Sequence, residues 1–172
     1  LKGLGHFLPL GESGEVFLFG ERPNKLPAWF VRHPWGVRVS YHAPKLFSLS
    51  VPASFTTVEQ GAFQVRISAP ERAMLEVLHL ATTNAAMDHA IELMTGLNTL
   101  RPRVVQSLLE GCRSVKVKRL FLWAAEEANH AWFGRLAVGR VDLGSGKRQA
   151  YRGGRLDAKY QITVPRKDDG HV

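Results

Sequence analysis

The chain has 172 residues, 45% of them hydrophobic, and carries a net charge of +8 at pH 7. This length is sufficient for one domain that buries a substantial core without a disulfide or a structural metal. The single cysteine, Cys112, excludes an intrachain disulfide and a cysteine-based zinc site and favours the cytoplasm, and the longest apolar run, residues 120–125, is too short for a membrane span of about 20 residues.

Strand signals dominate the first part of the chain. Residues 15–20 form a short apolar run that ends at a glycine, and residues 36–41 and 62–68 alternate apolar and polar side chains. Five prolines between positions 23 and 52 keep any helix in this region short. Residues 1–68 are therefore predicted to be mainly β and to contribute a sheet.

The next part, residues 69–133, is predicted to be mainly α. A first helix at about 69–81 is indicated by apolar residues at helical spacing, and the preceding Ser-Ala-Pro-Glu sequence fits a capping box. In that motif Ser68 caps the helix and Glu71 reaches back to the backbone, while proline is tolerated in the first turn.

Three further helices follow in this part of the chain. The second helix is predicted to be capped by Thr83 and Asn84 and to end at Gly96. The third is predicted at about 101–110, and the fourth from 115 to about 129. The apolar residues of the fourth helix are spread around its whole circumference, so we expect it to be the most buried of the four.

Strand signals return after residue 133. Strand formers at residues 136–141, 147–151 and 160–164 are separated by Gly144 to Gly146 and by Gly153-Gly154, and glycine adopts the positive φ that tight hairpins require. The predicted fold class is α+β, with an N-terminal β-sheet, a central bundle of about four helices and a C-terminal β-hairpin unit. A single domain is expected over residues 1–165, with a basic β-unit at 134–165 and a frayed tail at 166–172.

Two short motifs suggest catalytic or nucleotide chemistry only superficially. Residues 144–147, Gly-Ser-Gly-Lys, resemble part of a phosphate loop. However, Val141 stands where that motif requires its first glycine, and Arg148 stands where it requires a Ser or Thr after the lysine. Asp157 and Lys159 resemble the end of some metal-dependent nuclease motifs, but an isolated Asp-x-Lys occurs often by chance, and a solvent-exposed turn is by far the better explanation.

The other ionisable residues give no support for catalysis. The seven histidines never reach the i, i+4 spacing of a helical zinc pair, and His79 and His130 are expected to be partly buried hydrogen-bonding residues. Glu126 and Glu127 project about 100° apart on one helix, which is poor geometry for an acid and base pair. We therefore predict no enzyme activity, no metal and no cofactor.

The excess positive charge lies mainly in the C-terminal part, where residues 114–172 have a balance of +6. Nine cations there form the candidate contact set for nucleic acid or an anionic partner: Arg140, Lys147, Arg148, Arg152, Arg155, Lys159, Lys116, Lys118 and Arg119. The last three begin the fourth helix and oppose its dipole, which hints at a functional reason for them. A solvated edge strand that its cations protect from aggregation is nearly as good an interpretation of the others.

Several phrases of the sequence, taken in order, resemble the C-terminal domain of AbiEi-family antitoxins, the transcriptional regulators of type IV toxin–antitoxin systems. They cover nearly the whole chain: residues 4–11 (LGHFLPLG), 16–20 (VFLFG) with 26–29 (LPAW), 68–75 (SAPERAML), 117–123 (VKRLFLW), and 144–165 with its GSGKR, GGRLD and KYQITVP.

The resemblance implies a functional arrangement in two parts. In that family an N-terminal winged helix-turn-helix represses the operon by binding operator DNA. The C-terminal domain is required for antitoxicity against a nucleotidyltransferase-like toxin in abortive infection, a form of phage defence, and no stable toxin–antitoxin complex is needed. Since this chain begins at Leu1 without a methionine and shows no helix-turn-helix pattern, we expect the DNA-reading module to lie upstream and to be absent from it.

The leading prediction is thus a non-enzymatic antitoxin and regulator domain whose basic C-terminal face supports contact with DNA or another anion. A general nucleic-acid-binding domain without a toxin role is the first alternative. A metal-dependent nuclease-like enzyme that uses Asp157 and Lys159 is the weakest one.

Overall fold

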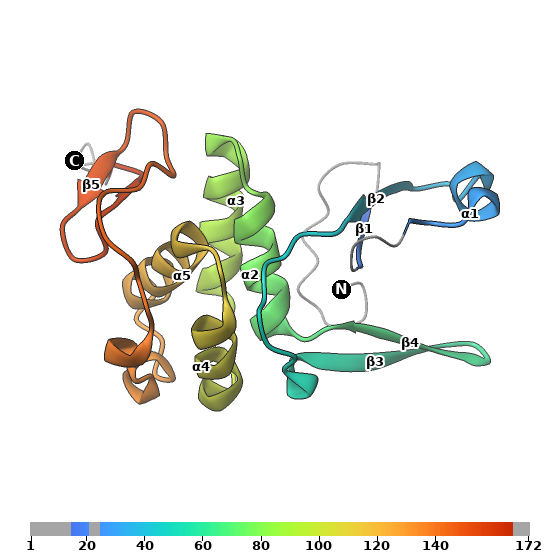
Figure 1. Cartoon of the computed structure of the whole chain (residues 1–172), viewed down its shortest axis with the longest axis horizontal. Coiled ribbons are helices and arrows are strands. Elements are labelled where there is room, and N and C mark those ends of the chain that lie inside the picture. The colour runs from blue at the N-terminus through green and yellow to red at the C-terminus, as the bar shows by residue number, and fades with distance from the viewer. Residues whose placement is uncertain (1–14, 21–24, 167–172) are drawn as a thin grey trace. The chain divides into compact units, whose positions relative to one another are not determined.

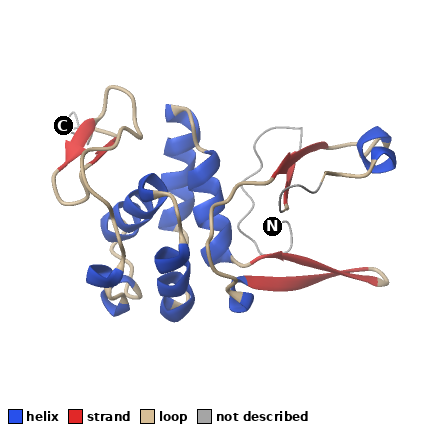
Figure 2. Cartoon of the chain, in the orientation of Figure 1, coloured by secondary structure: helices blue, strands red, loops and turns tan. Residues whose placement is uncertain are grey.

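The computed structural model describes residues 15–20 and 25–166, in two units that divide between Lys45 and Leu46 (Figure 1). The phrase at residues 4–11 and the tail from residue 167 on lie outside the described residues. The mixed α+β class is confirmed, and Figure 2 shows helices and strands along the chain. None of the helices in the described ranges has the length and apolar character needed to cross a membrane.

The first unit contains two strands and one short helix. Strand β1 (Glu15–Phe19) pairs in parallel with β2 (Arg38–His42), close to the predicted positions. Parallel strands need a crossover connection, and here it includes α1 (Ala28–Arg32), which the sequence analysis did not predict. Pro27 immediately precedes α1, where its fixed φ favours a helix start rather than opposing one.

The second unit begins with an antiparallel hairpin of β3 (Phe55–Gln60) and β4 (Phe63–Ser68). Strand β4 was predicted, whereas β3 was not, although its Phe-Thr-Thr-Val sequence is rich in strand formers. The two-residue turn between the strands places Gly61 at φ 60°, a conformation that glycine adopts without strain. The described strands of the first 68 residues thus form two separate two-stranded sheets rather than one.

Four helices form the body of the second unit, as predicted. They are α2 (Pro70–Leu80), α3 (Asn84–Thr95), α4 (Pro102–Gly111) and α5 (Val115–Glu127). Every residue of α5 from Val117 to Ala125 is buried, so the expectation that it is the most buried of the four helices is confirmed. Phe121 on α5 is fully buried and lies 6.1 Å from the ring of Trp132, beyond the end of that helix.

The caps of these helices were predicted with mixed success. The Thr83 hydroxyl accepts from the backbone N–H of Ala86 and caps α3, as expected. The capping box at α2 was wrong, because Ala69 is the N-cap and no side chain caps it. The Ser68 hydroxyl instead donates to Glu76 Oε2 at 2.8 Å, and the Glu71 carboxylate accepts from Arg101.

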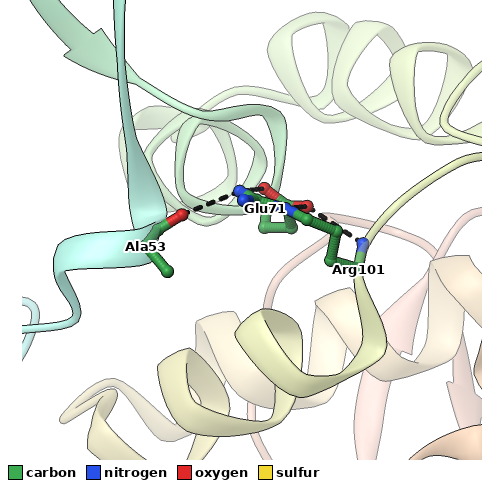
Figure 3. Close-up of polar contacts among 3 residues, drawn as sticks. All are labelled: Ala53, Glu71 and Arg101. Atoms are coloured by element: carbon green, nitrogen blue, oxygen red, sulfur yellow. Dashed lines mark hydrogen bonds and ion pairs between the residues drawn. The ribbon is translucent and has the colours of Figure 1, made fainter.

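Glu71 and Arg101 form a three-way junction between α2, the start of α4 and a 3₁₀ turn (Figure 3). Arg101 donates from its backbone N and Nε to Glu71 Oε1 at 2.9 and 2.8 Å and from Nη2 to Oε2 at 2.9 Å. The same Nη2 donates to the carbonyl of Ala53 at 2.8 Å. Burial alone would raise the pKa of Glu71, but the bonds from Arg101 hold that pKa below its ordinary value of 4.5.

The C-terminal part differs most from its predicted strands. Residues 136–141 contain a 3₁₀ turn, Val138–Arg140, instead of a strand, and residues 147–151 contribute only one bridge, from Arg148 to Ile162. The hairpin consists of β5 (Arg155–Asp157) and β6 (Ile162–Val164).

The turn of this hairpin does not use the predicted glycines. Asp157 Oδ1 accepts from the backbone N–H of Tyr160 at 2.8 Å, and Gln161 takes the positive φ, at 51°. A side-chain hydrogen bond within the turn therefore replaces the glycine signal that the sequence analysis relied on.

We expect replacement of Arg101 by alanine to lower the free energy of unfolding by about 3 kcal/mol, because the nearly inaccessible Glu71 carboxylate would lose its charge partner. The pKa of Glu71 is lowered in the folded state, so the difference in free energy of unfolding between the unmodified protein and the variant is fully present above pH 4.5. This difference shrinks as the pH falls through the folded pKa. Urea denaturation at several pH values measures both effects. Arg103→Ala, an exposed change on α4, is the control, and equal stability of the two variants would contradict the role of the junction.

Candidate anion-binding surface

The nine predicted contact cations fall into three groups in the structure. Arg119, Lys118 and Lys116 are wholly or partly buried, and Arg140, Arg155 and Lys159 pair with carboxylates. Lys147, Arg148 and Arg152 are exposed and form no ion pair with a carboxylate among the described residues. The set that the sequence analysis treated as one surface therefore has several different roles.

Arg119 on α5 is only 2% exposed and is surrounded by backbone carbonyls. Its Nε donates to Leu143 O at 2.9 Å, Nη1 donates to Gly146 O at 2.6 Å and Gln161 O at 2.9 Å, and Nη2 donates to Gly144 O at 3.1 Å. Burial, and then the nearby charge of Arg148, lower the pKa of this guanidinium. This carbonyl ring fastens the loop 143–146 and the start of β6 to the central helix.

The Gly-Ser-Gly-Lys loop has the opposite polarity to a phosphate loop. A phosphate loop directs backbone N–H groups at its ligand, whereas Leu143, Gly144 and Gly146 direct carbonyls at a cation. Gly144 has φ 59°, and a Cβ there would lie 3.0 Å from Cγ2 of Val115, so both conformation and space favour glycine. The geometry agrees with the sequence-based rejection of nucleotide binding at this loop.

The remaining cations at the start of α5 also have structural surroundings. Lys116 Nζ donates to the carbonyl of Ala81 at 3.2 Å, just beyond the end of α2, where a positive charge is favoured. Its burial lowers the pKa of the lysine. Lys118 is only 4% exposed. Contacts inside the fold thus account for Lys116 and Arg119, two of the three cations that appear unfavourable at the start of α5.

The paired cations hold the hairpin and its neighbours. Arg140 Nε lies 3.1 Å from Glu110 Oε1, and Arg155 Nη1 lies 3.9 Å from Asp157 Oδ2. Lys159 forms an ion pair with Glu126, and the hydroxyl of Tyr160 donates to the other oxygen of Glu126 at 2.9 Å.

These contacts favour the structural interpretation of Asp157 and Lys159 over the nuclease-like one. Asp157 closes the hairpin turn and Lys159 points to Glu126, so the two side chains serve different partners. The described residues contain no group of three or more histidine, cysteine or acidic side chains placed to hold a metal ion.

The exposed cations are held in place by their backbones. Arg148 bonds through its N–H to Gln161 O and through its carbonyl to Thr163 N, at 2.9 and 3.0 Å. Arg152 exchanges two hydrogen bonds with the side chain of Asn84 at the start of α3. These bonds fix the main chain while the charged ends of both arginines remain exposed.

Arg166 is an exposed cation that the predicted contact set left out. Arg166 lies at the end of the described residues, where a frayed tail was expected, and its Nε donates to the carbonyl of Gly153 at 3.2 Å. Its position directly after a strand-forming Ile-Thr-Val-Pro sequence was the available signal. We call Lys147, Arg148, Arg152 and Arg166 the exposed basic group.

Of the histidines, His130 has the structural role that was expected. It is 7% exposed, its Nε2 lies 2.7 Å from the carbonyl of Met94, and its ring stacks on Trp132 at 5.2 Å. Trp132 Nε1 in turn donates to the carbonyl of Leu97 at 2.8 Å. These bonds satisfy the polar atoms at the end of α3.

We expect Arg119→Lys to lower the free energy of unfolding by about 3 kcal/mol, because an ammonium group cannot reproduce the forked contacts and leaves buried carbonyls without a donor. Urea denaturation at neutral pH measures this change. Arg113→Lys, at an exposed position between α4 and α5, is the matched control. Unchanged stability of the Arg119 variant would show that the carbonyl ring does not hold the loop.

Comparison with known proteins gives one family match. The family described as "Transcriptional regulator, AbiEi antitoxin, Type IV TA system" matches residues 13–165. No curated protein and no solved structure was found to match. Because the family match spans most of the chain, the chain belongs to the AbiEi family of antitoxins, the transcriptional regulators of type IV toxin–antitoxin systems.

Proposed function

We propose that this chain is the non-enzymatic antitoxin domain of a cytoplasmic regulator that counteracts a nucleotidyltransferase-like toxin in abortive infection. The observation that carries this proposal is the family match over residues 13–165. A winged helix-turn-helix upstream of Leu1 would read the operator DNA, and antitoxicity would not require a stable complex with the toxin.

The exposed basic group supports a contribution to DNA binding. Arg148 and Arg152 are exposed, and hydrogen bonds on both sides fix their main chain. Cations placed in this way suit phosphate contacts, which add affinity without reading sequence. In the proposed function this group strengthens operator binding, and the upstream module supplies the sequence specificity.

The engagement of the acidic side chains supports a non-enzymatic role. Glu71 and Glu76 are buried against arginines, and Glu126 accepts from Lys159 and Tyr160. A general acid or base needs access to a substrate, and each of these carboxylates is already committed to the fold.

A general nucleic-acid-binding domain without a toxin role is the second candidate, because the exposed basic group would serve it equally well. Only a biological assay separates it from the antitoxin.

We expect bacterial growth to recover when the full-length protein is co-expressed with the toxin encoded beside it, because the domain would oppose the action of the toxin. Growth curves with and without toxin induction measure this rescue. Arg103→Ala, which changes an exposed residue of α4, should rescue as well as the unmodified protein. Failure of the folded, expressed full-length protein to rescue would remove the antitoxin function.

We expect the combined change of Lys147, Arg148 and Arg152 to glutamate to weaken binding of the full-length protein to its operator at low salt by at least 10-fold. Each lost phosphate contact should also lower the steepness of the salt dependence by about 0.9. Fluorescence polarisation over a range of salt concentrations gives both quantities. Arg103→Glu is the control, and unchanged affinity and slope in the triple variant would reduce this group to a device for solubility.

A further inference from the structure

The tryptophans of this chain divide sharply by exposure. Trp123 and Trp132 are 6% and 4% exposed and belong to the core of the second unit. Trp29 and Trp35 belong to the first unit and are 67% and 40% exposed. Tryptophan is the largest apolar side chain and is normally well covered, so two exposed tryptophans six positions apart indicate a surface that binds something.

The exposed tryptophans belong to an aromatic cluster built around α1, the short blue helix of Figure 1. Trp29 lies edge-on to Phe30 at 5.6 Å, and Phe30 lies 4.5 Å from Trp35. Trp35 also contacts His33 at 4.4 Å and donates from Nε1 to the carbonyl of Phe30 at 2.9 Å. Trp35 is thus held by its neighbours, while two thirds of Trp29 remains free for a ligand.

The chain segment that carries this cluster has charges of one sign, and the carboxylate of Glu15, the strand partner of Arg38 on β1, accepts from the Ser40 hydroxyl. Residues 25–45 contain Lys25, Arg32, Arg38 and Lys45 and no aspartate or glutamate. Arg32 is the last residue of α1, the helix that carries Trp29, and Arg38 begins β2 three residues after Trp35; both are exposed. Flat aromatic rings are therefore interleaved with cations over a span of ten residues.

We propose that Trp29 and Trp35, together with Arg32 and Arg38, form a stacking site for single-stranded nucleic acid. Every nucleotide of a single strand offers the two features that this cluster complements, an unpaired base face for the rings and a phosphate for the cations. Duplex DNA hides its base faces within the stack, so it satisfies only the cations. This site lies in a different unit from the exposed basic group and does not depend on the proposed antitoxin function.

The test measures binding of a fluorescein-labelled 12-nucleotide oligothymidine to the full 172-residue chain by fluorescence polarisation. Trp29→Leu keeps an apolar side chain but removes the ring, so we expect the dissociation constant to rise about 5- to 100-fold. Trp29→Phe retains a ring and should stay within about 5-fold of the unmodified protein. Val31→Ala is the matched control, because Val31 lies on the same helix and is 68% exposed but has no ring, and its affinity should not change.

A second measurement needs no variant and is independent of folding effects. Because the other two tryptophans are buried, stacking on Trp29 and Trp35 should quench the intrinsic fluorescence of the unmodified protein as oligothymidine is added. An abasic oligomer, which has the same phosphates without bases, should bind more weakly and quench little.

Four outcomes would overturn the stacking site. The first is an equal loss of affinity in Trp29→Leu and Val31→Ala, and the second is equal quenching by the abasic oligomer. The third is stronger binding of a matched duplex than of the single strand. The fourth is quenching by anionic phosphatidylserine vesicles but not by oligothymidine. The first would indicate a general apolar surface, the next two a phosphate surface, and the last a membrane surface.

Discussion

The C-terminal third of this protein depends on one buried guanidinium. Between α5 and β6 the described chain forms only short 3₁₀ turns, bends and a three-residue strand, which have few backbone bonds of their own. Arg119 compensates for this by binding four carbonyls from residues 143, 144, 146 and 161. A guanidinium suits this position because its donors diverge in a rigid plane, and because its charge is spread over atoms that carbonyl dipoles can solvate. With the loop fixed in this way, Arg148 and Arg152 occupy defined positions on the surface.

The sequence predicted those parts of the fold whose signals are local. Helix α3 has its cap at Thr83, and α5 has apolar residues on all sides, and both lie within two residues of their expected limits. The failures at the α2 cap and at the predicted glycine turns occurred where a distant partner competed with a local signal. Ser68 and Glu71 have the spacing of a capping box, but Glu76 and Arg101 offered them stronger, charge-assisted bonds. Likewise, the glycines that suggested hairpin turns at 144 and 146 shape a loop around Arg119.

Charge was the least predictable property, for a physical reason. A count of lysines and arginines measures the excess of positive charge in residues 114–172, but it does not distinguish a cation that binds a carbonyl from one that faces solvent. Arg119, Lys159 and Lys147 each count as one positive charge in the sequence. In the structure, however, Arg119 donates to backbone carbonyls and Lys159 forms an ion pair with Glu126. Only burial and pairing separate them, and both are properties of the folded chain. The aromatic cluster escaped notice for a related reason, since Trp29 would pass for a core residue until its exposure is known.

The two proposed surfaces differ in the kind of free energy that each would contribute. Phosphate contacts by Lys147, Arg148 and Arg152 release counterions, so their contribution falls steeply as salt rises. Stacking on Trp29 buries apolar ring surface and depends much less on salt, because no counterion is displaced by a ring. Affinity that persists at high salt would therefore arise in the first unit, and affinity lost at moderate salt would arise mainly in the second. Arg32 and Arg38 add a salt-dependent part to the affinity of the stacking site, so raising the salt separates the two surfaces only partly. The substitution of the ring at Trp29 isolates the part of the affinity that is due to stacking.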